Sequence, residues 1–272
     1  MIGKVKIYSL FLAFMILTTG LRYFQIHVFN FKYGGEFSPI FISVIFILLN
    51  RKDSFKMLSF NRFELKPLLL PILAIIFAVA IDFIVQFRFQ LIRQPVVDMS
   101  FLIKLAIFSV LFTILVGGFE EIGWRGYLTS KIIQYKLSWN QLIVITSIIW
   151  AIWHLPTHFS KFENHFYVQY PFFIISCFEL SIIMAYLRIR TNSVIPAIIL
   201  HSLIALLYEN FFKSTLNYKD FYFLTFPSIL MILLLLPVSI YYYKRGCKLY
   251  LDNLKTELKM AVPNMQYSKK GF

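Results

Sequence analysis

The sequence predicts an all-α protein, a polytopic transmembrane helical bundle with about eight membrane helices. Composition is the first observation behind this prediction. Of the 272 residues, 59% are hydrophobic and 15% are charged, and the mean hydropathy is +0.71. A soluble domain averages about 45–50% apolar and about 25% charged residues, so a cytosolic enzyme with a polar surface is excluded. The second observation is that the charges form short clusters between long apolar runs, as in multi-pass membrane proteins.

Net charge limits the classes of partner that the protein binds, and the cysteine count limits the kinds of site that it holds. The net charge is +14, with 27 Lys and Arg against 13 Asp and Glu. Because the basic residues lie between apolar runs, we expect a lipid bilayer and a membrane protein or peptide as partners, and no nucleic acid. The two cysteines, Cys177 and Cys247, are too few for a disulfide framework or a thiolate metal site.

The membrane helices follow from the apolar runs, since about 20 apolar residues span a bilayer as a helix. The first run follows a basic N-terminus but has no small-residue cleavage site after it, so we expect a retained membrane helix. The second run is short, and is either re-entrant or extended into its flank. Cutting the chain at its charges gives the runs Ile7–Leu21, Phe37–Leu49, Pro67–Phe87, Phe101–Phe119, Leu137–Trp153, Phe166–Leu187, Thr191–Tyr208 and Phe221–Tyr243.

The chain divides into four expected regions without an internal repeat. Residues 1–100 form N-terminal membrane helices, residues 101–210 form the core, and residues 211–243 form the last membrane helix. Residues 244–272 form a mobile basic cytoplasmic tail. Its most direct role is contact with anionic lipid, with partner binding as an alternative.

The distribution of basic residues predicts the orientation. With eight spans, both termini lie on one side, and 19 of the 27 Lys and Arg fall on that side. The positive-inside rule then places both termini in the cytoplasm of a multi-pass cell-membrane protein.

Ionisable residues at membrane depth are the candidates for function, because each costs at least ~2.5–3.5 kcal/mol on insertion scales. Glu121 and Arg125 are i, i+4 neighbours on a predicted helix and can pair, whereas Glu120 points about 100° away and stays available for chemistry. Glycines on this segment would let another helix approach closely. The ionisable set within the runs is Asp82, Glu120, Glu121, Arg125, His154, Glu179 and His201.

Depth brings three of these residues together. Glu120 lies 17 residues before position 137 and His154 lies 17 residues after it, so in a helical hairpin both are roughly 25 Å from the turn. His201 lies 11 residues after Arg190, roughly 16 Å from another turn on the same side, and a long first hairpin that projects into the cytoplasm would close the difference in depth. A glutamate with two histidines can hold zinc or orient a water molecule, and without a metal the carboxylate can act as a general base.

Each residue also has a structural interpretation. A Glu-Glu pair at a helix end is usually solvated, and a lone membrane histidine is more often a hydrogen-bonded core residue. Trp150 is by default a packing aromatic, and we take Asp82 and Glu179 as structural.

Three segments resemble the CAAX-protease and bacteriocin-processing family of intramembrane proteases, also called the Abi family. The E-E-x-x-x-R motif is complete from Glu120 to Arg125, and Gly126 follows it. An aromatic-x-x-x-His motif runs from Trp150 to His154. The approach to the family's last histidine is similar from Leu187 to His201. The resemblance covers roughly residues 102–208.

The resemblance implies a protease that hydrolyses a peptide bond of a membrane-associated protein or peptide. It implies that Glu120 activates a water molecule, alone or on a metal, and that His154 and His201 hold the water or metal and stabilise the oxyanion. Glu120, His154 and His201 would then form a zinc site. Glu121 with Arg125 would lock the helix. Family members act on prenylated CAAX proteins or are linked to bacteriocin processing, immunity and regulation.

One position departs from the family pattern. The family usually carries Asn four residues after the last histidine, and here that residue is Ala205. Either another donor such as Ser202 compensates, or the chain is a catalytically impaired relative that acts in bacteriocin self-immunity or as a membrane scaffold. A transporter would predict an internal repeat, which the sequence lacks.

Overall fold

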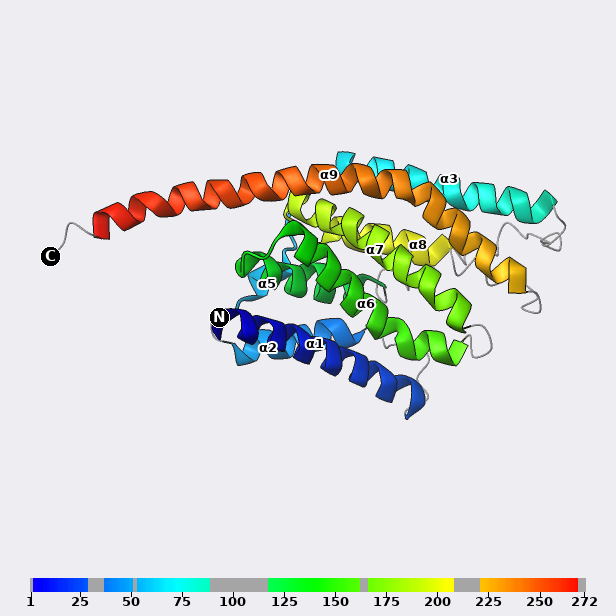
Figure 1. Ribbon diagram of the computed structural model, residues 1–272, viewed down its shortest axis with the longest axis horizontal. Coiled ribbons are helices and arrows are strands. Elements are labelled where there is room, and N and C mark those ends of the chain that lie inside the picture. Colours follow the sequence, from blue (N-terminus) through cyan, green and yellow to red (C-terminus); the bar gives the residue numbers. More distant parts are fainter. Residues whose placement is uncertain are drawn as a thin grey trace.

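The protein forms an all-helical bundle over the residues that the computed structural model describes, which are 2–28, 37–50, 53–88, 117–161, 166–207 and 221–268. No strand occurs among these residues, and the predicted fold class is confirmed (Figure 1). The helices are α1 (Ile2–His27), α2 (Ser38–Leu49), the 3-10 helix η2 (Phe55–Leu58), α3 (Lys66–Arg88), the π-helix η3 (Ile122–Leu128), α5 (Thr129–Gln134), α6 (Trp139–Lys161), α7 (Phe166–Thr191), α8 (Ile195–Leu207) and α9 (Phe221–Ser268).

Length and composition identify membrane spans among these helices. In the described part of the chain, four stretches are long and apolar enough to cross a bilayer. Each predicted run that falls in this part coincides with a helix, whereas the run Phe101–Phe119 lies almost wholly outside the described residues. The four stretches are Ile7–His27, Trp139–Phe159, Phe166–Thr191 and Ile229–Asn253.

The helices pack in layers. α1 and α2 form one side of the bundle and α3 lies along α9 on the other, with α6, α7 and α8 between them (Figure 1). α6 packs against both α1 and α7, and α7 packs against α9. The N-terminus, α5 and the C-terminal end of α9 point toward the same end of the bundle. The cytoplasmic assignment of that end remains a prediction.

Close packing against glycine joins α2 to the segment that carries the acidic pair. A Cβ atom on Gly123 would lie 2.7 Å from the carbonyl carbon of Pro39 and 2.8 Å from its oxygen, so only glycine fits against the start of α2. Gly117 and Gly118 lie against His201 and Ile198 of α8. The predicted role of these glycines as close-approach positions therefore agrees with the contacts.

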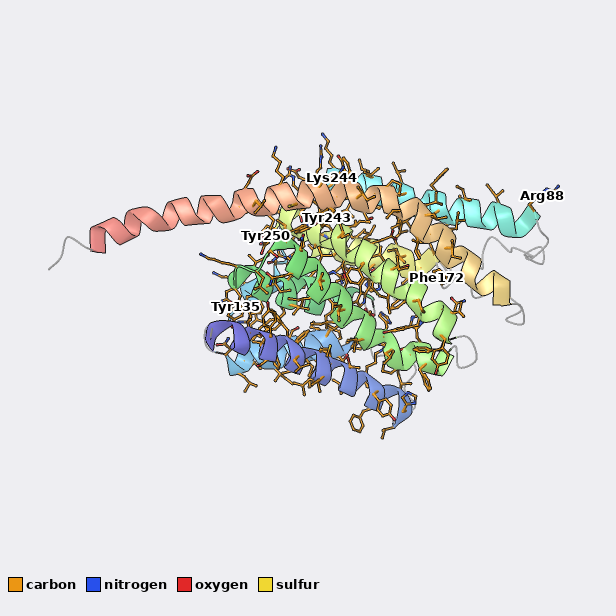
Figure 2. The ribbon with its side chains drawn as sticks, in the orientation of Figure 1. Arg88, Tyr135, Phe172, Tyr243, Lys244 and Tyr250 are labelled. Atoms are coloured by element: carbon orange, nitrogen blue, oxygen red, sulfur yellow. The ribbon has the colours of Figure 1, made fainter. Side chains whose placement is uncertain are left out.

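α9 continues past the boundary predicted at residue 243. The helix is 48 residues long, or about 72 Å at 1.5 Å per residue, which exceeds the roughly 30 Å of hydrocarbon in a bilayer. Tyr243 and Tyr250 point toward the bundle and Lys244 points away (Figure 2). The Tyr243 hydroxyl donates to Asn140 Oδ1 and the Tyr250 hydroxyl donates to the Leu137 carbonyl, each at 2.6 Å. The segment after residue 243 is therefore helical, and its first turns are docked on the bundle.

Candidate active site

The acidic pair lies where an α-helix changes into the π-helix η3, which differs from the predicted regular helix. Side chains add hydrogen bonds to carbonyl groups of this segment. Thr129 Oγ1 donates to the Trp124 carbonyl at 3.0 Å, and Arg188 Nε donates to the Arg125 carbonyl at 3.0 Å. Short π-helical segments occur frequently at functional sites. Tertiary hydrogen bonds, which the local sequence does not reveal, support this one.

Glu121 and Arg125 form the ion pair that their spacing predicts. Arg125 Nη1 lies 3.0 Å from Glu121 Oε2 and 3.1 Å from Oε1, and both residues are buried. A second nitrogen, Nη2, donates to Ser181 Oγ on α7 at 3.2 Å. The guanidinium carbon lies 4.4 Å from the centre of the Trp150 ring. Arg125 thus connects the π-helix to α6 and α7.

Glu120 faces α6 instead. Glu120 is 3% exposed, and its Oε2 accepts a hydrogen bond from Trp150 Nε1 at 3.2 Å. The same oxygen lies 3.7 Å from His154 Nε2. The structure therefore brings Glu120 and His154 together, at the matched depth that the hairpin argument requires. Trp150, taken from the sequence as a packing residue, also holds the carboxylate.

His201 reaches the acidic pair from α8, but through Glu121. Its Nδ1 lies 2.7 Å from Glu121 Oε1, so the carboxylate accepts the Nδ1–H hydrogen bond. The ring centre is 5.5 Å from that of Trp150. Because the two carboxylates point in different directions from the helix, Glu120 meets α6 and Glu121 meets α8. The sequence placed His201 beside Glu120 and did not resolve this difference.

Aromatic rings surround His154 and leave part of it accessible. Its ring centre lies 4.6 Å from that of Trp153 and 4.9 Å from that of Phe173. The side chains of His154 and His201 are 17% and 12% exposed, whereas the two carboxylates are buried. The two imidazoles are therefore more accessible than the two carboxylates beside them.

The predicted zinc ligands are not gathered around one point. Among the described residues, no three His, Cys, Asp or Glu side chains form a group that could hold a metal ion. One nitrogen of His201 is also taken by Glu121. This arrangement does not fit a zinc ion on Glu120, His154 and His201, and we derive no reaction step through one.

Several contributors to the site lie outside the predicted set. Arg22 is buried in α1, although the first predicted apolar run ended just before it. The sequence signal for this residue is a basic side chain directly after an apolar run. Trp153 donates from Nε1 to Ser38 Oγ at 2.7 Å.

Glu179 is buried on α7, and neither of its carboxylate oxygens has a hydrogen-bond partner among the described residues. The side chain of Asp82 falls outside the described residues.

The fold and the site define a class, a helical membrane protein with a buried carboxylate pair beside two accessible histidines. Residues 102–207 match the family model described as Type II CAAX prenyl endopeptidase Rce1-like. The chain is also similar to CAAX prenyl protease 2 of Methanococcus maripaludis, with 28% identity over 187 residues that cover 63% of this chain and 69% of the relative. These matches confirm the resemblance to the CAAX-protease and bacteriocin-processing family, and they support a CAAX-type intramembrane protease.

Proposed function

We propose that the protein is an intramembrane endopeptidase in which Glu120 is the general base. The observation that carries this proposal is the position of Glu120 Oε2, buried, hydrogen-bonded to Trp150 and 3.7 Å from an accessible histidine. A carboxylate in this position can take a proton from a water molecule that enters beside His154. The substrate is a membrane-associated protein or peptide, of the CAAX type or one involved in bacteriocin processing, immunity or regulation.

The reaction is an addition followed by an elimination. Glu120 removes one proton from water while the water oxygen bonds to the scissile carbonyl carbon, and the carbonyl oxygen becomes an oxyanion. Glu120 then gives that proton to the amide nitrogen, the C–N bond breaks, and the products are a carboxylic acid and an amine. Electrostatic stabilisation of the oxyanion is usually the largest single contribution to such a reaction.

His201 is suited to stabilising the oxyanion because Glu121 fixes its ring. The 2.7 Å hydrogen bond from Nδ1 to Glu121 Oε1 stabilises positive charge on the imidazole. Nε2–H can then donate to the oxyanion, while His154 donates from the opposite helix. Arg125 offsets the negative charge of Glu121 and keeps this carboxylate out of the proton transfer.

Zinc is a separate part of this hypothesis. The family resemblance implies the metal, while the grouping of the side chains does not fit it. Metal analysis of the purified protein tests the point directly, because about one zinc per chain in wild type and a lower content in Glu120→Gln would support metal binding.

A second candidate is a catalytically impaired relative that acts in bacteriocin self-immunity or as a membrane scaffold. Ala205 favours it, since this residue lies one turn after His201 in α8 and has no donor. Such a protein keeps its phenotype in Glu120→Gln and loses it when packing is disturbed.

The deciding experiment compares new peptide termini in membranes from cells that express wild type, Glu120→Gln or His201→Ala at equal levels. Termini that depend on both residues are expected, and they would identify the substrate. Identical termini in all three samples would refute the protease. If the host's protection phenotype persisted in both variants, the impaired relative would be favoured.

A further inference from the structure

Arg22 is a buried cation beside the site, and it comes from a helix outside the segment that matches the family model. The residue is 4% exposed and lies in α1, within the span Ile7–His27. An arginine at membrane depth costs at least ~2.5–3.5 kcal/mol on insertion scales, and such residues usually serve a function.

Two contacts with α6 fix the guanidinium on either side of His154. Arg22 Nε donates to Thr157 Oγ1 at 2.8 Å. Its guanidinium carbon lies 3.9 Å from the centre of the Trp153 ring. Trp153 and Thr157 lie one residue before and three residues after His154. A guanidinium held in this way keeps a fixed orientation, and its planar fork of N–H groups matches a carboxylate at two points.

The guanidinium is also close to the reacting groups. The Trp153 ring centre lies 4.6 Å from that of His154, so the Arg22 guanidinium carbon lies within 8.5 Å of the His154 ring centre, the sum of the two ring distances. Its positive charge acts on the Glu120 carboxylate. An anionic group on a substrate bound at Glu120 therefore enters the field of Arg22.

We propose that Arg22 binds the free C-terminal carboxylate of the substrate, so that the enzyme cuts a few residues from the end of a chain. This inference rests on the proposed endopeptidase function. In a C-a-a-X substrate, three residues follow the cysteine, and three extended residues span at most about 10 Å. The separation between the Arg22 guanidinium carbon and the His154 ring centre, at most 8.5 Å, lies within that reach. Arg22 is then a specificity residue contributed by α1.

The test pairs a change in the enzyme with a change in the substrate. Full-length protein in lipid nanodiscs is given one farnesylated peptide that ends in a C-a-a-X sequence, either with a free carboxylate or with a C-terminal amide. Wild type should cleave the amide form with a kcat/KM about 10- to 100-fold lower, mainly through KM, as expected for a lost charge-assisted hydrogen bond. Arg22→Gln should lose at least this factor on the acid form and a smaller factor on the amide form, where only the effect of its charge on Glu120 is removed.

Two further variants provide controls. Arg22→Lys, which keeps the charge but lacks the fork, should retain part of the preference for the acid form. Arg190→Gln removes an exposed cation, 48% exposed and 3.9 Å from Glu64, and should cleave both forms as wild type does. A melting temperature of Arg22→Gln in nanodiscs close to that of wild type would show that the variant is folded.

The outcomes separate this inference from the function on which it rests. Equal cleavage of the acid and amide forms by wild type overturns it, as does an equal loss on both forms in Arg22→Gln. Cleavage of neither form, with Glu120-dependent termini still found in cells, also overturns it and leaves the protease standing. Cleavage of neither form without such termini refutes both.

Discussion

The buried ion pair between Glu121 and Arg125 predicts how the free energy of unfolding changes when one or both charges are removed. At 3.0 Å and an effective dielectric constant of about 20, the attraction between the two charges is about 5.5 kcal/mol. Most of this offsets the cost of burying two ions. Removing Arg125 leaves the buried Glu121 carboxylate with its hydrogen bond to His201 but without the guanidinium, and breaking a buried ion pair in this way typically costs about 3–5 kcal/mol.

We therefore expect Arg125→Met to lower the free energy of unfolding by about 3–5 kcal/mol, because Glu121 is then a buried anion. The double variant Glu121→Gln/Arg125→Met removes both charges and should be more stable than Arg125→Met. The assay is unfolding of the full-length protein by SDS in mixed micelles, followed by tryptophan fluorescence.

The matched control is the exposed pair of Arg190 with Glu64, at 3.9 Å, with side chains 48% and 72% exposed. Arg190→Met should change the free energy of unfolding by no more than about 1 kcal/mol. If the double variant lost the sum of the losses measured for Arg125→Met and for Glu121→Gln alone, the two charges would not be coupled and the reasoning would be refuted.

Three other changes test neighbouring parts of the site. Gly123→Ala should destabilise the protein and abolish activity, because its Cβ would lie under 3 Å from Pro39. The control is Gly20→Ala, whose Cβ meets nothing within 4 Å and which should fold at least as well as wild type. Thermal unfolding of the two variants checks this difference. Trp150→Phe removes the hydrogen bond to Glu120 and should lower kcat about 10-fold with little change in KM, and an unchanged kcat would contradict the positioning role. Because the described side chains do not group around a metal, chelation should leave activity unchanged, and a loss that zinc addition restores would contradict this.

Local geometry explains which parts of the site could be predicted from the sequence. The pairing of Glu121 with Arg125 follows from an i, i+4 spacing, which holds at the start of η3. The meeting of Glu120 with His154 follows from equal distances to one turn. By contrast, the choice of Glu121 as the partner of His201 depends on how the helices are rotated about their axes. Packing sets that rotation, and no local pattern records it.

The π-helix also depends on contacts between segments that are distant in the sequence. Arg188 donates to the Arg125 carbonyl within η3, and also to Asn192 Oδ1 and to the hydroxyls of Ser59 and Ser130. These acceptors come from three separate segments of the chain. A sequence window around Glu120 contains none of the remote groups, so it predicts a regular helix there.

The N-terminal helices also act on the site, although the match to the family model begins only at residue 102. α2 supplies Ser38, which accepts the Trp153 hydrogen bond, and Pro39, against which the π-helix packs at Gly123. α1 supplies Arg22, which packs on the Trp153 ring and donates to Thr157 of α6. Since these contacts orient both the acidic segment and the helix that carries His154, the first two helices are part of the site's framework. Variation in α1 and α2 should therefore change substrate preference while the three motifs stay the same.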